Sequence, residues 1–230
     1  MDGVLLIDKP AGITSHDVVA RVRGSLDGAR TGHAGTLDPF ATGLLLVLVG
    51  RATKSQDRLM ALAKRYETIA QLGATSSTGD TEGEVTITGK LPPDPPPLPT
   101  GEVRQRPPAY SAVKIKGERA YKRARRGEQV QMPERIVTVH SFEQAWREPD
   151  AEHPGLERAG FQIECGSGTY VRSLIADLHD AYCLQLRRTA IGPFAVQRAV
   201  APPERGRDWT DPPLIELEQA LAMLPGARAH

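Results

Sequence analysis

Asp38 is the residue of this chain whose surroundings most strongly suggest chemistry. It lies in the stretch GHAGTLDPFATG, residues 32–43, which runs directly into the apolar segment LLLVLV of residues 44–49. Pro39 disfavours helical geometry at Asp38, and the nearby glycines permit the close approach of a ligand. A carboxylate beside a buried strand is costly unless a cation pairs with it. Asp38 is therefore a candidate catalytic residue, and the alternative is an aspartate that only caps a turn.

Arg172 is the candidate cation for such a carboxylate. It ends the stretch GSGTYVR, residues 166–172, and is followed by apolar residues at helical spacing. We therefore expect Tyr170 and Arg172 to face inward from a glycine-rich entry to a helix. The competing interpretation places Arg172 on the surface of the first helical turn.

Three tyrosines lie beside basic or glycine-rich segments in a chain that is only 5% aromatic. They are Tyr66, Tyr110 and Tyr170. Bases that are taken out of a stack are commonly held against aromatic faces, so these tyrosines are candidate base contacts. Each of them taken singly also fits a core or rim position, and His33 also fits a loop histidine without a role.

The segment from Arg104 to Arg126 is strongly basic, although the net charge of the whole chain is only +1. It contains nine lysines and arginines against one acidic residue, Glu118. This density indicates a polyanionic partner such as a nucleic acid. The alternative is a solvated helix face beside a basic loop.

Composition and absent motifs exclude several classes. The 230 residues, 40% hydrophobic and 25% charged, fit one large globular domain or two small ones. No apolar run reaches the length of a membrane helix, and MDGVLLIDKP lacks the cationic start of a signal peptide. Cys165 and Cys183 form no CxxC motif, so we expect reduced thiols in a cytosolic protein. Nucleotide-loop, zinc-protease and serine-hydrolase motifs are absent and the histidines lack ligand spacing, so neither a cofactor nor a metal is expected.

Hydrophobic periodicity predicts a mixture of strands and helices without a regular βαβ rhythm, which favours a mixed sheet. Strands are expected at residues 4–7, 44–49, 65–72, 136–140, 161–165, 184–191 and 194–196. Helices are expected at residues 15–26, 55–63, 118–126, 169–182 and 214–224. Thr14 and Asp17 have the spacing of a capping box at the first helix. Residues 73–80 are expected to form a polar loop, and the proline-rich residues 92–99 an extended connector.

Taken together, these motifs resemble the bacterial tRNA pseudouridine-55 synthases of the TruB type. The similar segments follow one another in the same order over most of residues 3–224: GVLLIDKPAGITSHDVV, GHAGTLDPFATGLL, GRATK, KRYETIAQLGATSSTGDTEGE, TGEVRQRPPAYSAVKIKGERAYKRARRGE, GSGTYVRSLIADL and LRRTAIGPF. The resemblance implies an α/β (mixed α+β) pseudouridine-synthase fold, with a mixed, mainly antiparallel central sheet flanked by helices. It also implies cofactor-free isomerisation of uridine 55 in the TΨC loop of tRNA. The base is flipped out, its glycosidic bond is broken, and the uracil is rejoined through C5.

The resemblance assigns roles to residues that match the family motifs. Asp38 matches the catalytic aspartate, Arg172 the arginine paired with it, and Tyr66 the aromatic residue that packs on the target base. The expected substrate-binding residues are His33, which matches a residue of base flipping, Tyr170 beside the arginine, Leu186 at the active-site leucine of the LRR segment, and Lys64, Arg123 and Arg126. The site attacked by Asp38, uracil C6 or ribose C1′, is left open.

The chain departs from the family pattern in three places. The stretch between Gly89 and Thr100 is short and proline-rich, about five residues are missing between Asp177 and Leu186, and the chain ends at His230. We therefore expect a single catalytic domain over residues 1–230 without the C-terminal PUA domain of many relatives. The expected protein is a cytoplasmic monomer whose partner is the T-arm of tRNA.

Two other functions compete with this one. A module that binds and remodels the T-arm without chemistry would use the basic segment and the tyrosines but would not need Asp38 with Arg172. An aspartate hydrolase acting on N-glycosidic bonds would commonly need a second carboxylate in a comparable loop, and the sequence offers none. Both comparisons favour the isomerase.

Overall fold

The computed structural model describes residues 1–108, 114–115, 117–120, 123, 126, 128 and 132–226. The chain forms two compact units, Met1–Tyr66 with Arg187–His230 and Glu67–Leu186, called here the first and the second unit. Two strands, β4 (Lys64–Leu72) and β12 (Ala181–Ile191), begin in one unit and end in the other. This division does not test the expectation of a single domain, which stays a prediction.

The first unit is built on a mainly antiparallel sheet. Its strand order is β14–β1–β3–β12, with β2 added to β3 and β13 added to β12, and only the β3–β12 pair is parallel. Its elements are β1 (Gly3–Lys9), α1 (Ser15–Ser25), β2 (Thr31–His33), β3 (Thr42–Val49), the 3-10 helix η1 (Gly50–Ser55), α2 (Gln56–Met60), β13 (Phe194–Ala195), the 3-10 helix η2 (Val196–Arg198), β14 (Leu214–Glu216) and α5 (Leu217–Ala222).

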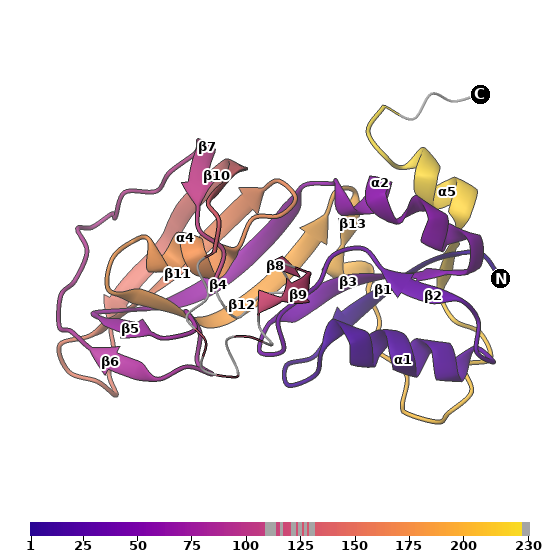
Figure 1. The fold of residues 1–230 in the computed structure, drawn as a ribbon, viewed down its shortest axis with the longest axis horizontal. Helices are drawn as coiled ribbons and strands as arrows, with labels where there is room; N and C mark the ends of the chain where they lie inside the picture. The colour runs from indigo at the N-terminus through magenta and orange to yellow at the C-terminus, as the bar shows by residue number, and fades with distance from the viewer. Residues whose placement is uncertain are drawn as a thin grey trace. The chain divides into compact units, whose positions relative to one another are not determined.

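Helices cover both faces of this sheet (Figure 1). Successive side chains of a strand point to opposite faces, so β1 sends Leu5 to one face and Leu6 to the other. Leu5 packs in the cluster that contains Val18 of α1, whereas Leu6 packs with Leu59 of α2 and Ala220 of α5. Burial on both faces explains why β1 and β3 have nearly continuous apolar sequences.

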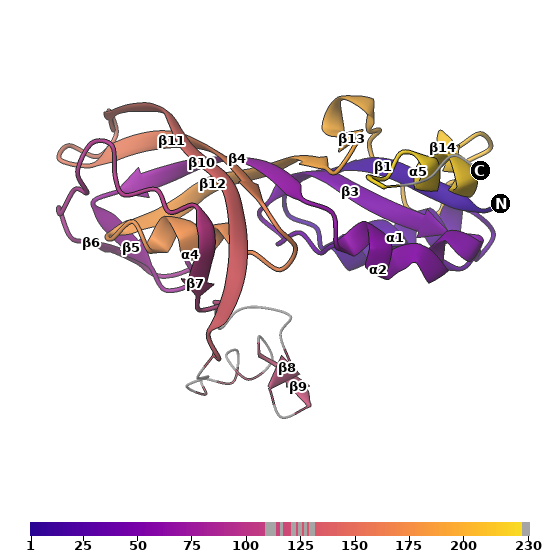
Figure 2. The same cartoon turned by 90° about the horizontal axis from the view of Figure 1, so that it is seen from above.

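The second unit contains a sheet of order β12–β4–β11–β10–β7. The strands β10 (Arg135–Pro149) and β11 (Glu157–Cys165) form a long antiparallel hairpin (Figure 2), and β7 (Gly101–Gln105) pairs antiparallel with β10. Among its described residues this unit also contains two small hairpins and a short helix: β5 (Ala74–Ser76) with β6 (Val85–Ile87), β8 (Lys114–Ile115) with β9 (Glu118–Arg119), and α4 (Val171–Ala176).

The predicted fold class, mixed and mainly antiparallel, is confirmed. So is the capping box, because the side chain of Thr14 accepts from the Asp17 N–H and the Asp17 carboxylate accepts from the Thr14 N–H. Cys165 and Cys183 are both buried, as expected, and no disulfide joins them. In the part of the chain that the structure describes, no helix has the length and apolar character that a membrane crossing requires.

Several predicted helix boundaries are wrong. The helix expected at residues 169–182 ends at Ala176, since His179 and Asp180 adopt positive φ angles of 67° and 48° that a helix cannot continue. The helix expected at residues 214–224 begins instead as β14, whose residues pair with β1. Helical periodicity could not detect this because three residues are too few to show a period.

Other expected elements are shorter or differ in type. The helix expected at residues 55–63 is α2, five residues long and preceded by a 3-10 turn. The polar loop of residues 73–80 begins with β5, which was not predicted. The helix expected at residues 118–126 starts instead with strand β9, and much of its remainder lies outside the described residues.

Candidate active site

Asp38 lies on the loop of residues 34–41 that joins β2 to β3. Ala34, Leu37 and Ala41 are buried, whereas Asp38 between them is half-buried. The loop is thus anchored by small apolar side chains, and the Ala34 N–H also donates to the carbonyl oxygen of Leu46 at 3.0 Å. This arrangement holds a carboxylate at the edge of a packed core.

The main chain on both sides of Asp38 is held by buried side chains. The Leu37 N–H donates to Oγ of Ser15 at 2.8 Å, and this hydroxyl lies 3.2 Å from the Leu37 carbonyl oxygen, to which it donates. The fully buried ammonium of Lys9 donates to the carbonyl oxygen of Pro39 at 3.1 Å and to two further carbonyl oxygens, of residues 10 and 13. Arg188 donates to the carbonyl oxygens of Gly35 and Thr36.

Three further candidate residues belong to the first unit. His33 ends β2 and its ring contacts that of His16 edge-on, with centroids 6.4 Å apart. Tyr66 and Lys64 of β4 are both buried. The Lys64 ammonium donates to the carbonyl oxygens of residues 60 and 62. Contact of these residues with tRNA stays a prediction.

Arg172 lies in the second unit and is 3% exposed, so the interpretation that placed it on the surface is wrong. Its guanidinium donates to the carboxylate of Asp80 at 3.0 Å and to the carbonyl oxygen of Thr78 at 2.7 Å. Asp80 is equally buried and also accepts from the hydroxyl of Thr78 and from the Glu82 N–H. The pairing of Arg172 with Asp38 would join the two units and stays a prediction.

Tyr170 is held through its main chain by one buried side chain. The amide of Gln105, which is 1% exposed, accepts from the Tyr170 N–H at 2.8 Å and donates to its carbonyl oxygen at 2.9 Å. The guanidinium of Arg135 stacks on the ring, 4.7 Å from its centroid. Leu186, the remaining candidate of this unit, is a buried residue of β12.

Arg123 and Arg126, the two candidate residues of the basic segment, already pair with glutamates. Arg126 forms two hydrogen bonds to Glu118, at 2.7 and 2.8 Å, and two more to Glu128, which also accepts from Arg123 at 2.7 Å. The hydrogen bonds that Arg126 donates to Glu118 and Glu128 raise the pKa of Arg126, and those that Arg123 and Arg126 donate to Glu128 lower the pKa of Glu128. Tyr110 and several basic residues of this segment lie outside the described residues.

Sequence reasoning missed five residues that hold the candidate residues in place: Lys9, Ser15, Asp80, Gln105 and Arg188. Asp80 stood in a stretch described only as a polar loop, and Gln105 ends a strand, β7, that was not predicted. No sequence signal marked Arg188 as buried, because Gln185, Arg187 and Thr189 of the same strand are also polar. Ser15 gave no signal beyond its place at a helix start.

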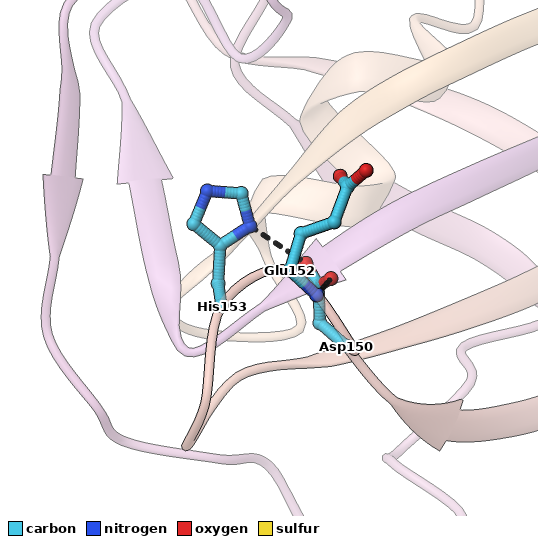
Figure 3. Close-up of side chains that lie close together, drawn as sticks. All are labelled: Asp150, Glu152 and His153. Atoms are coloured by element: carbon cyan, nitrogen blue, oxygen red, sulfur yellow. Dashed lines mark hydrogen bonds and ion pairs between the residues drawn. The ribbon is translucent and has the colours of Figure 1, made fainter.

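A group with metal-ligand spacing lies elsewhere in the second unit. Asp150, Glu152 and His153 bring ligand atoms within 4.8 Å of one another (Figure 3). The carboxylate of Asp150, however, already interacts with the Glu152 N–H at 3.0 Å, His153 Nδ1 at 3.1 Å and Arg158 at 3.1 Å. The group is thus a turn held by hydrogen bonds and an ion pair, and it offers a cation little free charge.

Comparisons with known proteins agree on one family. Residues 23–171 match the model of the N-terminal domain of TruB family pseudouridylate synthases. The chain is 43% identical to the tRNA pseudouridine synthase B of Thermobifida fusca, covering 94% of this chain and 78% of that protein. It is 42% identical to the enzyme of the same name from Synechococcus sp., covering 98% of this chain and 79% of that protein.

Solved structures match the fold of this chain at lower sequence identity. A chain of a Cbf5–Nop10–Gar1 complex is 30% identical with a TM-score of 0.61, over 84% of this chain and 50% of that one. A chain of an H/ACA RNP bound to a substrate RNA containing 2′-deoxyuridine is 27% identical with a TM-score of 0.60, over 86% and 50%. The present chain therefore spans about half the length of these solved chains.

Proposed function

Because the chain belongs to the TruB family of pseudouridylate synthases, we propose that it isomerises uridine 55 in the TΨC loop of tRNA to pseudouridine. Two relatives more than 40% identical to it are named tRNA pseudouridine synthase B, and this chain covers more than three quarters of each. The proposed enzyme is an isomerase that acts on the T-arm.

The reaction rearranges bonds within one nucleotide. The bond from ribose C1′ to N1 of uracil breaks, a bond from C1′ to C5 forms, and the hydrogen of C5 leaves to water while N1 gains one. No electrons are gained or lost overall, so the chemistry requires neither a redox cofactor nor a co-substrate. A nucleophile that adds to the nucleotide and leaves again is enough, and Asp38 fills this role in the proposal.

The observation that carries the proposal is the setting of Asp38. It is a half-buried carboxylate on a loop whose main chain is bound from several sides by buried groups. Such a setting keeps a nucleophile oriented and partly desolvated, which an aspartate that only caps a turn does not require.

The other candidate residues take roles around this carboxylate. In the proposal Arg172 keeps it ionised, Tyr66 packs on the flipped base, and Tyr170 and Leu186 complete the base site. Flipping involves His33, and backbone contacts to tRNA involve Lys64, Arg123 and Arg126. Aromatic packing on an extruded base and cationic contacts to phosphates are the usual division of labour in such enzymes.

The proposal extends to the whole chain. Residues 1–230 act as one catalytic domain, as a monomer, and without a cofactor or a metal. The protein acts in the cytoplasm, where its tRNA substrate is found.

The test uses unmodified tRNA with tritium at C5 of its uridines. Wild-type protein is expected to release the label of one uridine per tRNA, while Asp38→Asn binds tRNA but releases none. Asp27→Asn is the matched control, because Asp27 lies in a turn at a φ angle of 48° that asparagine also adopts. Substantial release by a folded Asp38→Asn protein would overturn the role of Asp38. Unchanged RNA with wild-type protein would indicate a binding module, and an abasic site a hydrolase.

A further inference from the structure

Among the residues that the structure describes, Arg188 has the largest fully buried side chain, with 1% of its surface exposed. Its guanidinium donates to the carbonyl oxygens of Leu44 at 2.8 Å, Gly35 at 3.0 Å and Thr36 at 3.4 Å. Within the described part of the chain, every hydrogen-bond acceptor of Arg188 is therefore a main-chain oxygen. Gly35 and Thr36 precede Asp38 by three and two residues.

Strand register brings Arg188 to this loop. β12 runs parallel to β3 with Arg188 opposite Gly43, the second residue of β3 after the loop. A Cβ atom at Gly43 would lie 2.3 Å from the carbonyl oxygen of Arg188, so the two strands approach this closely only because position 43 lacks a side chain. The φ angle of Gly43 is 101°, which further restricts the position to glycine.

Burying a guanidinium to bind carbonyl groups carries a large desolvation cost. Removing a charge from water costs several kcal/mol if no opposite charge compensates it, whereas a neutral amide can also donate to a carbonyl. A guanidinium offers in return charge-assisted, stronger bonds from several donors in one rigid plane. Arg188 uses that plane to tie the turn at Gly35 and Thr36 to the start of β3.

Other elements hold the rest of the same loop. Ser15, the first residue of α1, binds both the N–H and the carbonyl oxygen of Leu37, and Lys9 at the end of β1 binds the carbonyl oxygen of Pro39. Ser15 is 2% exposed and Lys9 is fully buried. The residues on both sides of Asp38 are thus fixed by side chains from three elements, while the Asp38 side chain itself is left at the surface of the core.

We propose that Arg188 is a positioning residue for Asp38, and that Ser15 acts with it by fixing the adjoining peptide group of Leu37. The inference rests on the proposed function, because it assigns Asp38 the role of nucleophile. Arg188 does not touch the substrate: it acts by holding the loop main chain. Loss of its bonds lets the carboxylate move, and a displacement of about 1 Å lowers a reaction rate roughly 100-fold.

The experiment measures the single-turnover release of tritium at saturating tRNA, together with the tRNA dissociation constant. Arg188→Met is expected to react about 100-fold more slowly with tRNA affinity within about threefold of wild type, because backbone contacts elsewhere dominate binding. Arg188→Lys keeps the charge and one donor group and is expected to recover about tenfold of that loss. Arg187→Met is the matched control, since Arg187 precedes Arg188 on β12 but pairs with Asp8 at 2.7 Å and is 38% exposed.

Ser15→Ala keeps the inference testable if Arg188→Met does not fold, since it removes one hydroxyl without opening a large cavity. It is expected to slow the reaction about tenfold and to leave tRNA affinity unchanged. The inference is wrong if folded Arg188→Met reacts at the wild-type rate, if Arg188→Lys is no faster than Arg188→Met, or if rate and affinity fall together. Wild-type protein that releases no label would instead overturn the proposed function.

Discussion

Two segments, one in each unit, carry charged candidate residues and are held in different ways. The loop of residues 34–41 carries Asp38 and is held by cations and a hydroxyl that bind its main chain. The segment of residues 166–172 carries Arg172 and is held by the neutral side chain of Gln105, which binds the main chain of Tyr170.

The two segments differ in the groups that compensate the buried positive charges of Arg172 and Arg188. In the second unit Arg172 pairs directly with a buried carboxylate, Asp80, so each residue stabilises the charge of the other. In the first unit the buried charge of Arg188 is compensated by main-chain dipoles. Loss of Asp80 would leave the buried charge of Arg172 without its ion-pair partner. Loss of Arg188 would leave carbonyl groups without a hydrogen-bond donor, which costs less free energy.

The largest effect on stability is therefore expected at Asp80. Asp80→Ala leaves the buried guanidinium of Arg172 without this carboxylate and should lower the free energy of unfolding by about 3–5 kcal/mol. Asp80→Asn keeps the shape and part of the hydrogen bonding, so its cost should be smaller. Urea unfolding of both variants measures this, and a loss below about 1 kcal/mol for Asp80→Ala would contradict the comparison.

The next largest difference in stability is expected between glycine-to-alanine substitutions near the two segments. Gly43→Ala places a Cβ atom 2.3 Å from a main-chain oxygen of β12 and should cost about 3 kcal/mol or more. Gly168→Ala in the other segment also has a positive φ of 84°, but its nearest neighbour is the flexible end of Arg135 at 3.8 Å. It should cost about 1–2 kcal/mol, from backbone strain alone. Equal losses in thermal unfolding of the two variants would show that the close approach of β12 is not a constraint.

Gln105→Ala should have an intermediate effect. It removes two hydrogen bonds and leaves the N–H and carbonyl oxygen of Tyr170 with no bond to this side chain, at a cost of about 1–3 kcal/mol. Gln144→Ala is the matched control, because Gln144 donates to Asp94 at an exposed site and its loss should cost about 0.5 kcal/mol or less. A Gln105→Ala protein as stable as the control would mean that Tyr170 is held by other contacts.

The smallest effect on stability is expected in the exposed network of Arg123, Arg126 and Glu128. Exposed ion pairs contribute little, so Glu128→Gln should barely change stability. It releases two arginines from one partner, however, and should therefore tighten tRNA binding and steepen its salt dependence. Glu204→Gln, which breaks the exposed pair with Arg207, is the control and should leave tRNA binding unchanged. Unchanged binding by Glu128→Gln would argue against the proposed roles of Arg123 and Arg126.

The lowered pKa of Glu128 predicts that its contribution to stability depends on pH. Hydrogen bonds from Arg123 and Arg126 hold the pKa of Glu128 below its ordinary value of 4.5. A lowered pKa in the folded state means that the stabilisation is present above about pH 4.5 and is lost as the pH falls through the lowered pKa. Acid unfolding of wild type and Glu128→Gln should therefore converge at low pH.

The sequence by itself determined features whose physical cause is local. The glycines and proline around Asp38 restrict the backbone there, and the capping box needs only the three-residue spacing of Thr14 and Asp17. Continuous apolar residues marked β1 and β3 as buried strands, and the order of the motifs indicated the family. The apolar helical pattern after Arg172 favoured burial but left a surface position open, and it did not predict the partner Asp80.

Only the tertiary structure decided which groups meet. Asp80 precedes Arg172 by 92 positions, and the acceptors of Arg188 lie 144–153 positions before it. Periodicity shows which face of an element is buried but carries no record of the partner strand or its register. Strand pairing determined where β12 begins, why residues 214–216 form a strand, and how Arg188 reaches the Asp38 loop. Hydrogen bonds between distant segments outweigh local propensity at these positions.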